Sequence, residues 1–422
     1  MFIISLLSPA LSLLIILGLC FKNWKNNVTK DIKRLTVPLG MIFGTMGYCF
    51  RFFAETNDLS RYFIQVNSIS GQSFGEIIAS DSEMLYLRDG LFYFVNKCGN
   101  QYILPFIVGF LIYSISFYVL FDMICRSKRQ YRYSEVFLLS IIMVGILAPL
   151  IVIGNTRCVL SFILITFAIY RDIIQQKHNL ITLLLYVAPI GLHSSAIVII
   201  MIRLMSIVFK KYEKAKWVIL SIVLFLPTII DFFYEHVAGL LSGPVGSILV
   251  NAINKAHWYL HWTSGGWATQ VDSSISSKLV KVFGTIFLIM IIYLVFKKPR
   301  NNNQDEHVNN NKSLYKEPMI SFLFLTAVFA LGCLHIKTGA FWRFESIVVL
   351  FSPVVLIQAI DNKVISKKFF YIMCAYASML VIYNILYQIS NTNATQTMIN
   401  FTTTPGVKIL YEIGKGVIHL GG

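Results

Sequence analysis

Residues 180–209 read LITLLLYVAPIGLHSSAIVIIMIRLMSIVF, and this stretch decides the expected fold. It is almost wholly apolar except at its centre, where Pro189, Gly191 and the triplet His193-Ser194-Ser195 interrupt it. A bilayer core of ~30 Å needs about 20 helical residues to cross it. The stretch is therefore too long for one upright span and short for two.

The flanks of this stretch favour two crossings. Arg171 and Lys177 precede it, and four lysines follow within 210–216. Short basic loops belong on the cytoplasmic side, so both ends are expected there. The prediction is a re-entrant or broken hairpin whose polar tip points outwards and faces a cavity, because non-helical backbone at that depth needs protein or water around it. The alternative is one long tilted helix with a kink at Pro189.

Composition places the whole chain in a membrane. The 422 residues are 56% hydrophobic, 14% aromatic and 13% charged, with a mean hydropathy of +0.68. This predicts an all-α, polytopic integral membrane protein. The net charge of +16 lies in short loops, where the positive-inside bias accounts for it without nucleic acid. The seven cysteines form no CxxC, so neither a disulfide framework nor a metal site is expected.

We expect about 11–12 transmembrane helices in a single multi-span domain, 1–422. They are placed at 2–21, 35–53, 102–121, 136–153, 156–170, 180–192, 195–209, 217–234, 279–296, 319–335, 346–360 and 369–388. Loops on one side then carry 23 Lys and Arg, and those on the other carry 10. The richer set should be cytoplasmic, which makes both termini periplasmic. A single crossing at 180–209 would destroy this bias.

Three connections are long. The predicted periplasmic loops are 54–101 and 235–278, and the Asn-rich stretch 297–318 reads as a flexible cytoplasmic linker. The second periplasmic loop contains the aromatic run 257–262 (HWYLHW). A lipid-interface belt and a sugar-stacking surface both explain such a run, and both remain open.

Several polar residues are predicted at the outer ends of the spans. They are Arg51, Asp58, Arg61, Arg157, His193, Ser195, Lys337 and Arg343. Cations gathered at one membrane face need a cavity or a bound anion, and guanidinium groups match phosphate oxygens in pairs. A diphosphate is thus the expected counter-charge. For any single arginine, snorkelling to the interface is the competing explanation. Arg203 lies within the returning arm with no evident acidic partner.

The order of these features resembles the EpsG/Wzy-type polysaccharide (O-antigen) polymerases. The matching pieces are Arg51 followed by Asn57-Asp58-x-x-Arg61-Tyr62, Arg157 opening an apolar span, His193-x-Ser195-Ala196, and Arg343 ahead of a late span. The chain departs from the family in having Leu59 where a tyrosine often follows the aspartate.

The resemblance implies an activity and its partners. Such enzymes transfer a growing glycan from undecaprenyl pyrophosphate onto the next lipid-linked oligosaccharide unit, at the periplasmic face of the bacterial inner membrane. A chain-length regulator and a flippase would be their companions. No cofactor is expected, and no metal, because cations can take its place at the diphosphate.

The resemblance also implies roles for the candidate residues. His193 or Asp58 would accept the acceptor proton as the catalytic residue. Arg51, Arg61, Arg157, Ser195, Lys337 and Arg343 would bind the pyrophosphate or glycan. The alternatives are a flippase or other transporter for lipid-linked oligosaccharide, and a ligase-like membrane glycosyltransferase.

Overall fold

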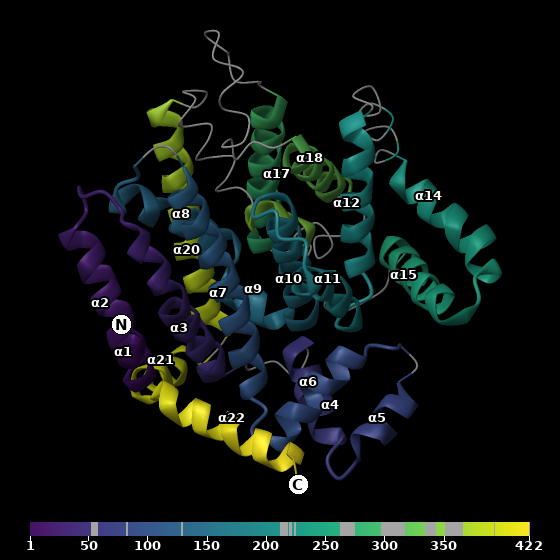
Figure 1. Cartoon of the computed structure of the whole chain (residues 1–422), viewed down its shortest axis with the longest axis horizontal. Helices are drawn as coiled ribbons and strands as arrows, with labels where there is room; N and C mark the ends of the chain where they lie inside the picture. The colour runs from purple at the N-terminus through teal and green to yellow at the C-terminus, as the bar shows by residue number, and fades with distance from the viewer. Residues whose placement is uncertain are drawn as a thin grey trace. The chain divides into compact units, whose positions relative to one another are not determined.

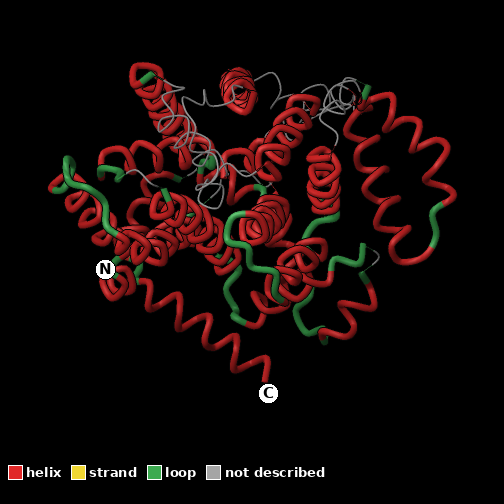
Figure 2. Tube along the Cα trace, turned by 45° about the horizontal axis from the view of Figure 1, so that its top comes forward, coloured by secondary structure: helices red, strands yellow, loops and turns green. Residues whose placement is uncertain are grey.

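The computed structural model describes residues 1–51, 58–81, 83–127, 130–211, 218, 222, 225–261, 275–296, 317–333, 343–350, 366–391 and 393–421. Figure 2 shows that these residues are helical and contain no strand, which confirms the all-α prediction. They fall into two compact units, each described by itself below. Unit 1 takes residues from Met1–Asp81, Tyr86–Ile163 and Lys367–Gly422, and unit 2 takes those from Ser82–Leu85 and Leu164–Ser366.

Unit 1 contains helices from both ends of the chain (Figure 1). They are α1 (Phe2–Leu7), α2 (Pro9–Lys22), η1 (Lys30–Leu35), α3 (Thr36–Cys49), α4 (Asp58–Ser68), α5 (Phe74–Ser80), α6 (Tyr86–Lys97), α7 (Ile103–Arg126), α8 (Tyr133–Ile146), α9 (Pro149–Gly154), the first part of α10 (Thr156–Ile173), α20 (Lys367–Asn391), α21 (Ala394–Thr403) and α22 (Gly406–Gly421).

Two of the expected spans are each divided by a proline. The span expected at 2–21 becomes α1 and α2, and the one expected at 136–153 becomes α8 and α9. Pro9 and Pro149 are each the first residue of the second helix. Proline suits that position because it has no N–H to donate and cannot continue the preceding helix. At the first break the Ser8 hydroxyl also caps α2 by accepting from the Leu11 N–H at 3.2 Å.

The antiparallel pair α3 and α7 forms the centre of unit 1. Glycines on α3 allow the two backbones to approach closely: a Cβ placed on Gly47 would lie 2.5 Å from the Pro105 carbonyl oxygen, and one on Gly44 would lie 3.0 Å from that of Phe106. Gly40 in turn meets Ser114. Gly40 and Gly44 are four residues apart, the spacing of small residues that often permits close helix packing in a bilayer, and Gly47 extends the contact by three residues. The end of α3 thereby lies beside the start of α7.

Unit 2 contains the stretch that decides the fold. Its helices are the rest of α10, α11 (Leu180–Val187), η2 (Ala188–Gly191), α12 (Ala196–Lys211), α14 (Leu226–Phe232), the π-helical η3 (Phe233–Val237), η4 (Ala238–Leu240), α15 (Gly243–His261), α17 (Ile275–Phe296), α18 (Glu317–Gly332) and a helical segment at 343–350.

The chain reverses direction between α11 and α12. The Tyr186 hydroxyl, on α11, and the Arg203 guanidinium, on α12, both donate to Oδ2 of Asp172, at 3.1 and 2.8 Å. In one continuous helix these residues would be ~25 Å apart, at 1.5 Å per residue. One carboxylate oxygen could not reach both. The chain therefore folds back within 180–209 and does not form one continuous helix; whether this hairpin is re-entrant in a membrane stays a prediction.

The segments expected as long outer connections carry helices. The described part of 54–101 forms α4, α5 and α6, while 235–278 begins with η3 and η4 and continues as α15. The tail after 389 forms α21 and the amphipathic α22, shown in yellow in Figure 1, which packs on α6 and α1. Residues 297–316 of the expected linker lie outside the described residues. Whether these connections are periplasmic or cytoplasmic stays a prediction.

One helix in the described part of the chain is both long and apolar enough to cross a bilayer. It is α7, with 24 residues, and the shorter apolar helices include α2, α12 and α18. The expected number of 11–12 spans therefore stays a prediction, as does the single membrane domain.

Candidate functional site

Arg51 lies at the junction where α3 ends and α7 begins. Its guanidinium carbon is 3.8 Å from the centroid of the Tyr102 ring. Nη1 donates to the carbonyl oxygens of Tyr48, at 2.9 Å, and Phe50, at 3.0 Å. A cation stacked on an aromatic face gains ~0.5–2 kcal/mol. The close pairing of α3 and α7 thus holds this arginine in place from two sides.

The same junction is anchored to the C-terminal helix. The carboxylate of Glu412 on α22 accepts hydrogen bonds from the Tyr48 hydroxyl, at 3.0 Å to Oε2, and from the Asn100 amide, at 2.8 Å. The Arg51 carbonyl oxygen accepts from the backbone N–H of Asn393, at 3.2 Å. Segments from three parts of the sequence therefore fix the surroundings of Arg51.

Helix α4 connects this arginine to a second one. Phe63 on α4 meets the Tyr102 ring edge to face, with centroids 5.2 Å apart. The preceding residue, Tyr62, presents its ring to Arg157, whose guanidinium carbon is 4.7 Å from the centroid. Adjacent residues of one helix thus join two arginine–aromatic stacks. Asp58 and Arg61 occupy the first turn of the same helix, so unit 1 brings four of the candidate residues together.

Arg157 is half-buried in the first turn of α10. Its Nε is buried and has no hydrogen-bond partner among the described residues. Thr156, the first residue of the helix, is fully buried and donates through its hydroxyl to the Ile153 carbonyl at 2.6 Å. The first turn of a helix is also the positive end of its dipole. An arginine with a vacant buried donor at this position is suited to an anion.

Asp58 and Arg61 form an ion pair with each other, one turn apart on α4. Asp58 is the less exposed partner, at 24% of its side chain against 61% for Arg61. The Asp58 carboxylate is thus already engaged by the neighbouring Arg61 guanidinium, and this contact favours a positioning role for Asp58 over the catalytic role that the resemblance implies.

His193 and Ser195 meet at the turn of the hairpin in unit 2. Nδ1 of His193 is 2.5 Å from the Ser195 hydroxyl and 3.3 Å from the Ser195 backbone nitrogen, which can only donate. Nδ1 is therefore an acceptor, and in the neutral ring the proton resides on Nε2. In this arrangement the Ser195 hydroxyl is the side-chain group in direct contact with Nδ1.

The partner of Arg203 is Asp172, which sequence reasoning missed. Asp172 belongs to the C-terminal end of α10, close to the start of α11. Oδ1 of its carboxylate also lies 3.0 Å from Nδ1 of His178. The sequence did indicate that such a partner exists, because Arg203 lies inside an apolar segment, where a charged side chain requires an acidic partner. Nothing in the one-dimensional sequence places an acid 31 residues away at the right depth.

Arg343 is half-buried at the start of the helical segment 343–350, and its neighbour Phe344 packs on Phe329 of α18 with centroids 4.7 Å apart. Glu345 is 2% exposed, and Oε2 of its carboxylate has no hydrogen-bond partner in the described part of the chain. This buried acid lies against Gly284 of α17, where a Cβ would come within 2.5 Å of it. Glu345 was not among the residues predicted from the sequence. Lys337 lies outside the described residues.

The fold and these contacts define a class of protein: one that is helical over the residues the structure describes and that holds arginines on aromatic rings beside the start of an apolar helix. Comparison with known families makes this specific. The chain belongs to the EpsG family, whose model matches residues 34–403. Membership supports a membrane glycosyltransferase of the polysaccharide polymerase kind. Neither the curated proteins nor the solved structures contain a match.

Proposed function

We propose that this protein extends a surface polysaccharide by moving a growing glycan from undecaprenyl pyrophosphate onto the next lipid-linked unit. The observation that carries the proposal is the pair of arginine–aromatic stacks joined by α4, Arg51 on Tyr102 and Arg157 on Tyr62. Two guanidinium groups held in this way offer two fixed positive charges for a diphosphate. The proposal places the reaction at the periplasmic face, where the positive-inside bias puts these residues.

The reaction breaks the bond between the anomeric carbon and the diphosphate oxygen of the donor. The electron pair of that bond leaves with the lipid pyrophosphate, whose negative charge rises by one. A hydroxyl of the acceptor sugar forms the new glycosidic bond and loses its proton. The enzyme must therefore stabilise a developing anion and accept one proton.

The arginines serve the first requirement. Donors placed beforehand where charge develops are usually the largest electrostatic contribution to catalysis. Arg157 is the principal candidate, because its buried Nε lacks a partner among the described residues and because it lies in the first turn of α10. Arg51 adds a second cation. Arg343 and Lys337 are further proposed contacts to the pyrophosphate or glycan.

The hairpin turn serves the second requirement. The acceptor proton would pass to the Ser195 oxygen as the Ser195 proton moves to Nδ1 of His193, which the 2.5 Å contact allows. Alternatively, the Nε2–H of His193 would donate to a diphosphate oxygen, and another group would take the proton. The buried carboxylate of Glu345 is the alternative base within unit 2.

The test is complementation of a strain lacking its own polymerase, scored by the length distribution of its polysaccharide. Wild type should restore a ladder, while Arg157→Ala and Arg51→Ala should leave single-repeat chains at equal protein level. Arg34→Ala is the matched control, because Arg34 is 84% exposed and pairs only loosely with Asp31 at 3.4 Å. It should keep the full ladder.

Two results would contradict the proposal. If lipid-linked units accumulated on the inner face of the membrane without the protein, it would be a flippase. If single repeats reached their final acceptor only when the protein was present, it would be a ligase. Full ladders from both arginine variants would leave the polymerase activity in place and overturn the proposed site.

A further inference from the structure

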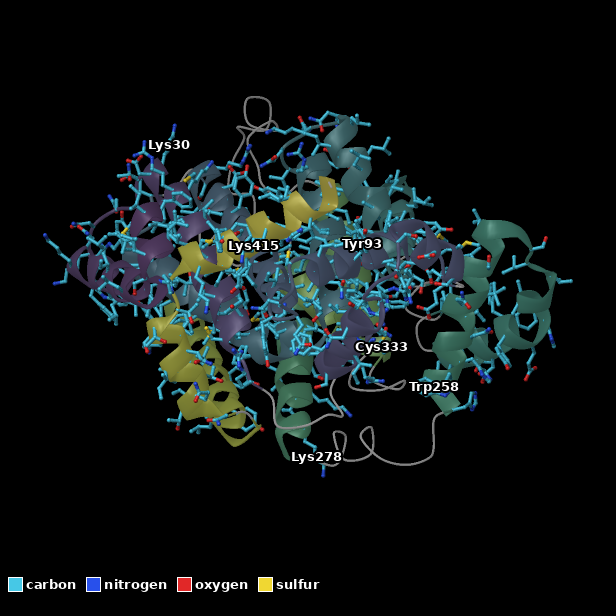
Figure 3. All side chains as sticks on the ribbon, turned by 90° about the horizontal axis from the view of Figure 1, so that it is seen from below. Lys30, Tyr93, Trp258, Lys278, Cys333 and Lys415 are labelled. Carbon is cyan, nitrogen blue, oxygen red and sulfur yellow. The ribbon has the colours of Figure 1, made fainter. Side chains whose placement is uncertain are left out.

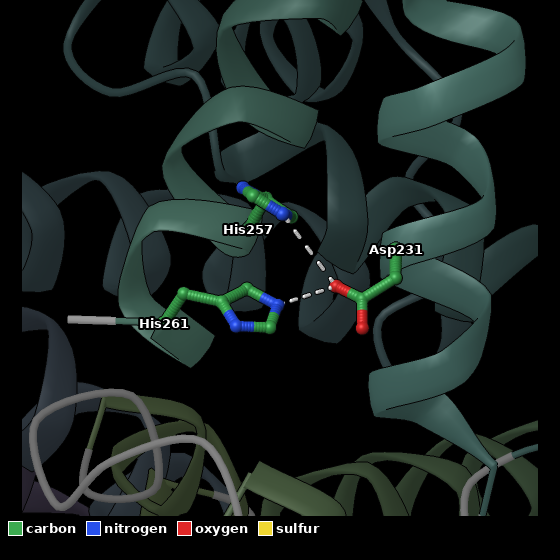
Figure 4. A group of neighbouring side chains, drawn as sticks. All are labelled: Asp231, His257 and His261. Carbon is green, nitrogen blue, oxygen red and sulfur yellow. Dashed lines mark hydrogen bonds and ion pairs between the residues drawn. The ribbon is translucent and has the colours of Figure 1, made fainter. Parts of the chain in front are cut away.

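A cluster of metal-ligating side chains lies apart from the residues discussed above, between α14 and α15 of unit 2. Figure 4 shows Asp231 on α14 facing His257 and His261 on α15. Nε2 of His261 is 2.8 Å from Oδ1 of Asp231, and Nε2 of His257 is 3.7 Å from the same oxygen. One potential ligand atom from each residue lies within 4.8 Å of the other two.

The local helices explain why these three side chains converge. His257 and His261 are four residues apart on α15, so they project from one face of the helix. Their rings are neighbours, with centroids 4.5 Å apart. Asp231 comes from the last turn of α14, just before the chain enters the π-helical η3. Single π-turns of this kind occur often at functional sites.

The orientation of the first imidazole is fixed by a ring outside the cluster. Tyr234 stacks face to face on His257, with centroids 3.7 Å apart and planes at 4°. Tyr234 belongs to η3, so the turn that follows Asp231 also aligns the histidine facing it. A ligand held in position before the ion arrives loses less conformational freedom when the ion binds.

The donor set selects the kind of ion. Two imidazole nitrogens and one carboxylate oxygen suit Zn²⁺ and related divalent transition metals, whereas Mg²⁺ and Ca²⁺ require oxygen ligands. Zinc bonds of about 2.0–2.1 Å in a tetrahedron place ligand atoms roughly 3.3 Å apart. The two distances to Oδ1, 2.8 and 3.7 Å, lie on either side of that value. The ligand atoms of the two histidines lie within 4.8 Å of each other, so the imidazoles must move closer together to complete a coordination shell.

We propose that Asp231, His257 and His261 bind one zinc-class ion that fastens α14 to α15. A tetrahedral ion held by three side chains has a fourth coordination position, which water or another bound molecule can occupy. The side chains of Asp231, His257 and His261 are 36%, 24% and 56% exposed, so an ion can enter from solvent. This site departs from the sequence expectation of no metal, and it does not depend on the proposed polymerase activity.

The competing explanation is a hydrogen-bonded trio without an ion, in which the carboxylate accepts from one or both imidazoles. Sequence reasoning noticed His257 and His261 only as part of an aromatic run. The missing information was Asp231, which lies 26 residues before His257 and meets it only because α14 and α15 pack together.

The experiment uses the full-length protein, purified without a histidine tag, stripped with a chelator and dialysed against limiting Zn²⁺. Metal bound per chain is measured by mass spectrometry, and thermal unfolding is followed with and without Zn²⁺. Wild type should retain about one zinc per chain, as a single three-ligand site requires. Its melting temperature should rise with zinc, because an ion that binds only the folded state stabilises it.

The variants decide between the two explanations. Two variants should lose both the bound zinc and the thermal shift: the double variant His257→Ala with His261→Ala, and the single variant Asp231→Asn. His236→Ala is the matched control, because His236 follows Asp231 closely in the chain but lies outside the cluster. The centroid of its ring is 4.9 Å from that of Phe232. It should keep both. Zinc content in wild type no higher than in the double variant would overturn the proposal, as would equal loss in His236→Ala.

Discussion

Arg157 lies over the ring of Tyr62, with 4.7 Å between the guanidinium carbon and the ring centroid. The arginine opens an apolar helix and the tyrosine belongs to a short amphipathic one, 95 positions earlier in the chain. The stack leaves the buried Nε of Arg157 without a protein partner among the described residues. A charged group is thus held in one orientation by a ring that does not neutralise it.

The first prediction concerns this stack. Arg157→Ala should lower polymer formation by about 10²–10³, the usual cost of removing one donor that stabilises developing charge. Arg157→Lys keeps the charge but loses the planar fork and the stacking, so it should restore only part of the activity. Tyr62→Leu should also reduce activity, and Tyr62→Phe should reduce it less because the ring remains. Turnover in membranes of matched protein content measures all four.

Equal activity in Tyr62→Leu and Tyr62→Phe would show that the ring does not position the arginine. The control is Tyr411→Leu, which removes the ring of another cation–aromatic pair. Nζ of Lys415 lies 4.8 Å from the centroid of the Tyr411 ring, on the exposed face of α22. Lys415 is labelled in Figure 3. That change should leave turnover intact.

A second prediction tests the packing that sets the Arg51 junction. Gly47→Ala would place a methyl group 2.5 Å from the Pro105 carbonyl oxygen, so α3 and α7 must separate. We expect a loss of about 1–3 kcal/mol in stability, as for other overpacked sites, together with reduced activity. The matched control is Gly18→Ala on α2, where a Cβ meets nothing within 4 Å. It should stabilise α2 by up to ~1 kcal/mol from helix propensity alone.

Thermal unfolding and turnover should be measured on both glycine variants. The prediction fails if Gly47→Ala and Gly18→Ala have the same melting temperature. Unchanged activity in a destabilised Gly47→Ala would separate the packing of α3 on α7 from the function of Arg51.

The helical class, the break at 188–195 and the candidate cations could be read from the sequence, because each depends on local composition or on short-range spacing. The partners of these groups could not. Asp172 for Arg203, Tyr102 for Arg51 and Asp231 for His257 all come from tertiary packing, which hydropathy does not encode. The helices within 54–101 and after 389 lie outside the predicted spans for a related reason: they are short and amphipathic, so they lack the long apolar signal of a span.

A third prediction concerns the ion pair that closes the hairpin. Asp172→Asn removes the counter-charge from Arg203, whose side chain is 12% exposed. Leaving a buried charge unpaired costs about 3–5 kcal/mol, so the variant should melt much earlier or accumulate poorly. Replacing both residues, Asp172→Asn with Arg203→Met, should recover part of that loss. The control is Asp31→Asn in the exposed pair with Arg34, where we expect no more than ~1 kcal/mol.

The double variant, Asp172→Asn with Arg203→Met, shows whether the unpaired charge of Arg203 causes the loss of stability. If it is no more stable than Asp172→Asn alone, the cost does not come from the unpaired Arg203, and the carboxylate matters instead for Tyr186 or His178. If Asp172→Asn and Asp31→Asn behave alike, the hairpin is held together by its apolar contacts.

The fourth prediction decides how His193 works. With Nδ1 accepting from Ser195, the neutral ring presents N–H at Nε2. A glutamine at this position can place an N–H₂ donor near Nε2 but has no basic nitrogen. If His193 donates to the diphosphate, His193→Gln should retain clearly more activity than His193→Ala, and Ser195→Ala should have a small effect.

If Ser195 and His193 relay the acceptor proton, all three variants should be similarly inactive, because a relay fails when either member is removed. Turnover of all three variants at matched protein level therefore separates a donor from a base, and an inactive Ser195→Ala would show that the proton passes through the hairpin turn.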